Sequence, residues 1–287
     1  MKHLETPFDQ HAKRVNQIGY HNHRVNTHSD IISDGIVQDL RVTCEVLKDD
    51  LDSLLVGYWR NRKNPWGRKR NTDLVVAEPI AGAISPGDTP PAKEAWRGAA
   101  AFRKVDPDLN KIRMVVEHKS IMTAHRNLSA RHDDLNNLAQ EAAKSPNVIV
   151  GATVMVGTAP KVLNVPDGVK KLFKSDPAKF ERKVVSRMKK HDPRLWSDFK
   201  EFVSLNQPSH IVNSFHVLLS TVVKRRSPDN RNVEGYDAFL VVPVFYDNVN
   251  KARVVRDNPY GIDVDKEYRR FIQRIADDYK QLYGSSK

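Results

Sequence analysis

The residues of this sequence best suited to chemistry are Glu117 and Lys119, which end the apolar run Ile112-Arg-Met-Val-Val-Glu-His-Lys119. Side chains of a strand alternate between its two faces, so an extended segment places Glu117 and Lys119 on the same face. A carboxylate can hold a divalent cation, and an adjacent ammonium can stabilise phosphate charge or position an attacking water. The pair therefore indicates metal-dependent phosphodiester chemistry.

A second carboxylate, Asp73, begins the apolar run Thr72-Asp-Leu-Val-Val-Ala77. If the two runs are neighbouring strands, Asp73 meets Glu117 and Lys119, and such hard oxygen ligands suit Mg²⁺ better than zinc. Asp108, which lies closer to Glu117 in the sequence, is the alternative to Asp73 as the second carboxylate of the site. We favour Asp73 because Asp108 falls in a predicted turn at the far end of the strand from Glu117, and each strand residue adds about 3.3 Å.

Apolar periodicity predicts the elements that carry these residues. Apolar spacings of three and four predict helices over residues 30–60, 129–144, 211–222 and 268–279. Short apolar runs predict strands over residues 72–77, 112–119, 148–156 and 237–246. Turn residues over 106–110 predict a hairpin between 99–105 and 112–119. The strand, helix and strand that lie between residues 112 and 156 predict a crossover unit.

This order of elements predicts an α/β fold with additional helical regions. The predicted organisation has an N-terminal arm (1–29), a core (30–160) with an insertion at 79–98, a basic helical region (161–230) and a C-terminal strand and helix that complete the core (231–287).

The charge balance favours a polyanionic partner, because 47 Lys and Arg face 35 Asp and Glu, a formal charge of +12. A charge that serves only solubility is the alternative.

No window is apolar enough to span a membrane and the N-terminus lacks an apolar signal core, so we expect a cytoplasmic protein without membrane contact. The single cysteine, Cys44, excludes an internal disulfide and is expected to pack in the core. The absence of a Gly-rich phosphate loop with a Lys argues against a nucleotide-driven motor.

The segments Asn71-Thr-Asp73-Leu-Val-Val and Val115-Val-Glu117-His-Lys119 resemble the signature of the PD-(D/E)XK nuclease superfamily, the fold of most type II restriction endonucleases. The resemblance covers residues 30–156 and implies a restriction-endonuclease-like core, in which helices flank a mixed central sheet. It implies a Mg²⁺ ion bound by Asp73 and Glu117, with the carbonyl oxygen of His118 as a further ligand. It also implies that Lys119 orients or deprotonates the attacking water.

The sequence departs from the family pattern at two points. Thr72 stands where the family has a proline, and the two acids are far apart in sequence because residues 78–110 intervene. Some members of the family use a further acid on the helix before the sheet, and Glu45 is the candidate here.

Basic and polar residues near these segments are candidates for contact with DNA: Arg68, Lys69 and Arg70 in the loop before Asp73, and His125, Arg126 and Asn127 after Lys119. The latter three are equally suited to starting a helix. Together, the family resemblance and these basic residues predict a Mg²⁺-dependent endonuclease of double-stranded DNA. The expected form is a type II restriction endonuclease that acts as a homodimer. A repair, transposon or phage nuclease of the same fold is the alternative enzyme. A nucleic-acid-binding protein without catalysis is the alternative outside enzymes.

Overall fold

The computed structural model describes residues 3–4, 27–63, 71–81, 105–122, 127–163, 175–180, 182, 186, 203–222, 230–247 and 252–284. Its main sheet has six strands in the order β1-β2-β3-β4-β7-β8. These strands are β1 (Gly57–Lys63), β2 (Asn71–Pro79), β3 (Pro107–Ile121), β4 (Ile149–Gly157), β7 (Ala238–Phe245) and β8 (Arg253–Val254). A second, two-stranded sheet pairs β5 (Lys161–Leu163) with β6 (Val203–Leu205).

The main sheet is mixed. Strands β1, β2 and β3 pair antiparallel, β3, β4 and β7 pair parallel, and β8 is antiparallel to β7. The helices are α2 (Thr27–Thr43), α3 (Glu45–Asp52), α5 (Leu128–Ala142), α7 (Pro177–Phe180), α9 (Pro208–Ser220) and α10 (Val264–Tyr283). Helix α5 connects the parallel strands β3 and β4, as the crossover unit predicts. The predicted α/β fold with a mixed, helix-flanked sheet is confirmed.

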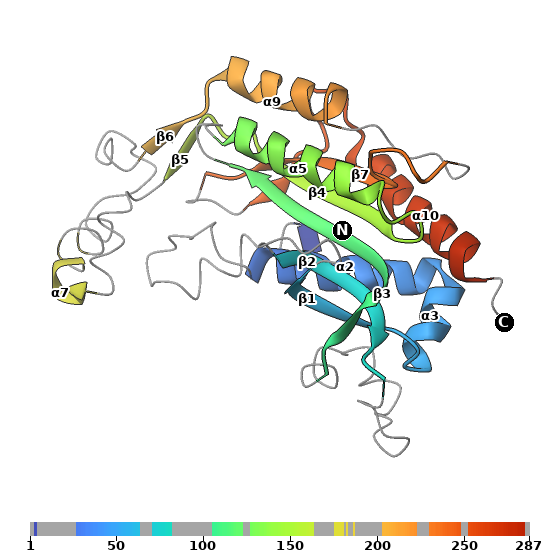
Figure 1. Cartoon of the computed structure of the whole chain (residues 1–287). Helices are drawn as coiled ribbons and strands as arrows, with labels where there is room; N and C mark the ends of the chain where they lie inside the picture. The colour runs from blue at the N-terminus through green and yellow to red at the C-terminus, as the bar shows by residue number, and fades with distance from the viewer. Residues whose placement is uncertain are drawn as a thin grey trace.

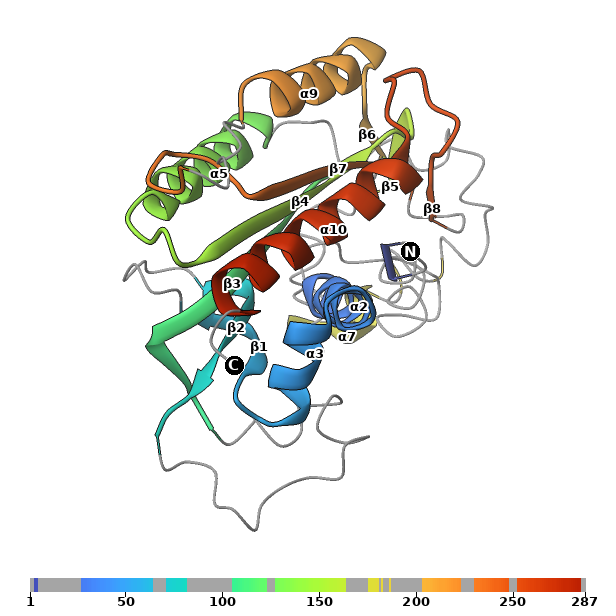
Figure 2. The same ribbon diagram turned by 90° about the vertical axis from the view of Figure 1, so that its right-hand side faces the viewer.

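Helices cover both faces of the sheet. Helices α2, α3 and α10 pack on one face and α5 and α9 on the other (Figures 1 and 2). Strand β4 is buried along its whole length, as expected for a parallel strand with helices on both sides. No helix in the part of the chain that the structure describes is long and apolar enough to cross a membrane.

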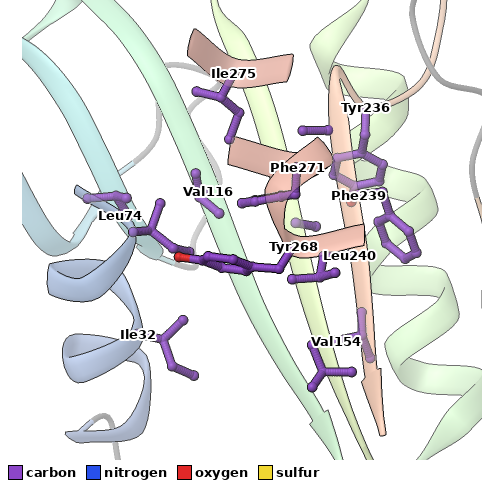
Figure 3. Packing of buried hydrophobic residues seen from close by; sticks show 14 of the residues in the cluster. Ile32, Leu74, Val116, Val154, Tyr236, Phe239, Leu240, Tyr268, Phe271 and Ile275 are labelled. Atoms are coloured by element: carbon purple, nitrogen blue, oxygen red, sulfur yellow. The ribbon is translucent and has the colours of Figure 1, made fainter. Parts of the chain in front are cut away.

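The core between the sheet and α10 shows which way the side chains of β3 point. A Cβ atom at Gly151 on β4 would lie 3.3 Å from Val116 and 3.5 Å from both Ile275 and Phe271 of α10. Val116 therefore faces α10, and Figure 3 shows it beside Phe271 and Leu74 in the same layer. Because side chains alternate along a strand, Glu117 points to the opposite face.

The predicted long helix over residues 30–60 is wrong. The chain leaves the helical conformation at Cys44 (φ −119°, ψ 101°), and Leu54 then adopts a left-handed conformation (φ 60°) before β1 begins at Gly57. The apolar spacing predicts one helix because α2, α3 and β1 all bury side chains in the same core. Adjacent Tyr58 and Trp59 are both buried, which fits a strand covered on two sides rather than a helix.

The predicted turn over residues 106–110 is also wrong, because β3 begins at Pro107 and pairs there with Pro79 of β2. Leu109 and Asn110 are exposed, so the turn-forming residue types occupy a solvated end of the strand rather than a hairpin loop. Of the predicted first arm, 99–105, the structure describes only Val105. Most of the N-terminal arm, the insertion and the basic region also lie outside the described residues.

Candidate active site

The register of β2 and β3 brings two carboxylates together. The pairing of β2 with β3 ends at Leu74 and Val116, and Asp73 and Glu117 are the next residues on the two strands. The backbone N–H of His118 donates a hydrogen bond of 2.8 Å to Asp73 Oδ2, and the backbone N–H of Asp73 donates to the Glu117 carboxylate. Each acid is thus held by the backbone of the other strand.

Lys119 completes this group. It lies two residues after Glu117 on the same face of β3, and its ammonium forms an ion pair with Glu117 Oε1. Only 13% of the Lys119 side chain and 14% of the Glu117 side chain are exposed. The structure therefore brings Asp73, Glu117 and Lys119 together as two carboxylates with one ammonium, shielded from water.

Burial is the main cause that perturbs the pKa values of both acids. Burial, and then the charge of Asp73, raise the pKa of Glu117 to about 7, although Lys119 opposes the shift. Burial also raises the pKa of Asp73, against the hydrogen bond from His118 and the charge of Lys119. Perturbed carboxylates of this kind cluster at functional sites.

The first turn of α2 also contacts the group. The Ser29 hydroxyl hydrogen-bonds to the Asp73 carboxylate, and the charge of Asp30 contributes to raising the pKa of Asp73. Asp30 and Asp34 lie one helical turn apart and both face Arg60 on β1, with nitrogen–oxygen distances of 4.0 and 2.9 Å. Ser29 and Asp30 are not among the site residues that the sequence predicts. The available signal was the four-residue spacing of polar residues at the start of an amphipathic helix.

Glu45, the predicted helix ligand, is not part of this group. It is exposed at the start of α3, beyond the far end of α2. Asp73 contacts Ser29 at the near end of α2, and sixteen helical residues span about 24 Å. The helix carboxylate that lies near Asp73 is instead Asp30.

Asp108, the alternative first acid, is also distant from the group. It lies nine residues before Glu117 on the extended strand β3, which corresponds to about 30 Å. Its Oδ1 accepts a hydrogen bond of 3.0 Å from the backbone of Asn110. The structure thus pairs Glu117 with Asp73 and not with Asp108.

The side chain of His118 points away from Glu117 and Lys119. Its Nδ1 lies 2.8 Å from Thr153 Oγ1 on β4, and its Nε2 lies 3.0 Å from Ser33 Oγ on α2. Burial and the charge of Lys119 lower the pKa of the imidazole to about 3, so the ring is neutral. Only the backbone of His118 lies beside the two carboxylates. The metal ligand that the family resemblance implies is the carbonyl oxygen of this backbone.

Most of the residues predicted to contact DNA cannot be located: Arg68, Lys69, Arg70, His125 and Arg126 lie outside the described residues. Asn127 is described, and it is exposed immediately before α5. Its backbone carbonyl accepts the first hydrogen bond of the helix from Arg131, at 2.9 Å, whereas its side chain makes no capping bond.

The donor set is compatible with Mg²⁺ but not with a closed protein cage. Among the residues that the structure describes, no group of three or more His, Cys, Asp or Glu could hold a metal ion. Mg²⁺ usually takes only one or two carboxylates and keeps water and phosphate oxygens in its other positions, whereas structural zinc needs four protein ligands. Two buried carboxylates with raised pKa values fit the first pattern.

Comparison with known proteins adds no assignment: no family model, no curated protein and no solved structure matches this chain.

Proposed function

We propose that this protein is a Mg²⁺-dependent endonuclease that hydrolyses phosphodiester bonds of double-stranded DNA in the cytoplasm, with a core of the PD-(D/E)XK type. The observation that carries the proposal is the group formed by Asp73, Glu117 and Lys119 on two neighbouring strands. Two carboxylates with one ammonium leave a surplus of negative charge in a buried position, which a divalent cation would neutralise.

In this proposal Asp73 and Glu117 hold the metal ion, together with the backbone carbonyl of His118. The bound Mg²⁺ would lower the pKa of a water molecule and stabilise charge on the phosphate. Lys119 opposes the rise in the pKa of Glu117 that burial causes, and its ammonium can orient the water or stabilise a phosphate oxygen. Ser29 holds Asp73 through its hydroxyl, at the positive end of the α2 dipole.

The formal charge of +12 supports a nucleic-acid substrate, because lysine and arginine side chains neutralise backbone phosphates. Cutting both strands of a duplex favours a two-fold symmetric dimer, and a type II restriction endonuclease is the form that we propose. A repair, transposon or phage nuclease of the same fold would recognise DNA structure instead. A DNA of known sequence would distinguish the two, since a restriction enzyme yields discrete fragments.

The direct test is cleavage of a supercoiled plasmid with Mg²⁺ by the wild type, Asp73→Asn, Glu117→Gln and Lys119→Ala. We expect each variant to lose about 10²- to 10³-fold in rate, since each removes a charge that acts on the transition state. Glu78→Gln is the matched control, because Glu78 also lies on β2 beside charged partners of β3 but not at this site. Full activity in the three variants would remove the proposed site. Salt-sensitive DNA binding without strand breaks under any divalent metal would instead favour a non-catalytic binding protein.

A further inference from the structure

A buried polar chain crosses the core directly behind the candidate active site. The His118 ring hydrogen-bonds to Ser33 of α2 through Nε2 and to Thr153 of β4 through Nδ1, at 3.0 and 2.8 Å. Ser33 and Thr153 are both completely buried. Three elements that are distant in sequence are therefore joined through one side chain.

Both ring nitrogens of His118 have hydrogen-bond partners. A neutral imidazole has one donor and one acceptor nitrogen, and a hydroxyl group can serve either role, so each ring nitrogen of His118 has a matching partner. A buried polar network costs desolvation energy wherever it is incomplete, whereas a complete one favours one arrangement of the elements that it joins. The neighbouring residue on the same face, Val116, packs against α10, so an apolar residue at position 118 would suit this layer.

The position of the chain indicates what it holds. The backbone of His118 lies between Glu117 and Lys119, and its N–H binds Asp73. On α2, Ser33 lies one turn after Ser29, whose hydroxyl also binds Asp73. The ring therefore connects the strand that carries Glu117 to the helix whose first turn supports Asp73.

We infer that Ser33, His118 and Thr153 are positioning residues, which set the distance between the Asp73 and Glu117 carboxylates by fixing α2 against β3 and β4. This inference rests on the proposed function, in which those carboxylates hold a divalent cation. Residues behind metal ligands orient the ligands, and their replacement typically costs 10- to 100-fold in metal affinity or activity.

The test is Mn²⁺ binding by calorimetry on the full chain without DNA, alongside plasmid cleavage over a range of Mg²⁺ concentrations. We expect Thr153→Val and His118→Leu to weaken Mn²⁺ binding about 10-fold and to raise the Mg²⁺ concentration for half-maximal cleavage similarly. Cleavage at saturating Mg²⁺ should fall much less. His118→Gln, which keeps one donor and one acceptor, should restore most of the affinity.

Ser214→Ala is the matched control, because Ser214 is also a buried helix serine, and its hydroxyl donates to the His210 carbonyl on α9. It should leave Mn²⁺ affinity unchanged. If His118→Leu does not fold, Thr153→Val decides, because valine keeps the shape of threonine. Unchanged Mn²⁺ affinity in Thr153→Val, with an active wild type, would overturn this inference alone. A wild type that neither binds Mn²⁺ nor cleaves DNA would overturn the proposed function as well.

Discussion

Strand β3 carries two charged clusters, and their comparison separates a structural role from a candidate functional one. Near its start, Arg113 contacts Asp50 of α3 at 2.8 Å and Glu78 of β2 at 3.0 Å, and Lys111 contacts Glu78 at 2.8 Å. Two cations face two carboxylates, so the charges balance. Near the end of the strand, Asp73 and Glu117 lie beside Lys119, the one cation that the described part of the chain places against both acids.

The pKa values of Glu78 and Glu117 shift in opposite directions. Burial tends to raise the pKa of Glu78, but the hydrogen bonds and charges of Lys111 and Arg113 outweigh it and lower the pKa below its ordinary value. Glu117, on the same sheet, instead has its pKa raised to about 7 by burial and by Asp73. A balanced cluster stabilises the fold as it stands, whereas the unbalanced one is stabilised by an added cation.

The largest effect on stability is expected from Arg113→Met. The substitution takes the guanidinium away from Asp50, whose side chain is only 2% exposed, and should cost about 3–5 kcal/mol in the free energy of unfolding. Lys111→Met removes an exposed partner of Glu78 and should cost far less, since water screens that pair. Chemical denaturation measures both losses. Equal losses of stability in the two variants would contradict the larger contribution expected of Arg113.

The pH dependence of stability should have opposite signs for the two clusters. Because Glu117 binds its proton more tightly in the folded state, its contribution is present below pH 4.5 and is lost as the pH rises to about 7. The loss is on the order of 3 kcal/mol, measured as the difference between wild type and Glu117→Gln without divalent ions. Glu78, with a lowered pKa, should lose its contribution as the pH falls. If the free energy of unfolding changes with pH in the same way in the wild type and in Glu117→Gln, the raised pKa of Glu117 is wrong.

Divalent cations should stabilise only the unbalanced cluster. At a concentration one hundred times its dissociation constant, a bound ion adds about 2.7 kcal/mol to the free energy of unfolding. We expect Mg²⁺ to raise the melting temperature of the wild type and of Glu78→Gln, but not of Glu117→Gln. Scanning calorimetry without DNA measures this shift, and an equal shift in all three proteins would place the ion elsewhere.

The smallest effects are expected from Glu45→Gln and Asp108→Asn. Both carboxylates lie near the surface and far from Asp73, so each substitution should change stability by less than about 0.5 kcal/mol and leave plasmid cleavage intact. A loss of cleavage in Asp108→Asn comparable with that of Asp73→Asn would reverse the choice between the two acids.

Much of the fold could be predicted from the sequence, because the central elements have clear apolar patterns. The strands around Val75, Val115, Val154 and Val241 and the closing helix at Ile275 all occur where periodicity predicts them. The errors lie outside these elements, in the helix predicted to run through Cys44 and in the turn predicted at Pro107. At both places, pairing and packing with distant segments override the local pattern.

The sequence by itself determined that Glu117 and Lys119 share one face of a strand, because the alternation of side chains is a property of the extended backbone. Only the tertiary structure decided that Asp73 lies beside Glu117, that Ser29 supports Asp73, and that the His118 ring binds Ser33 and Thr153. Those contacts depend on the register between strands and on the seating of α2. Both are set by the summed packing of the whole core rather than by any local run of residues.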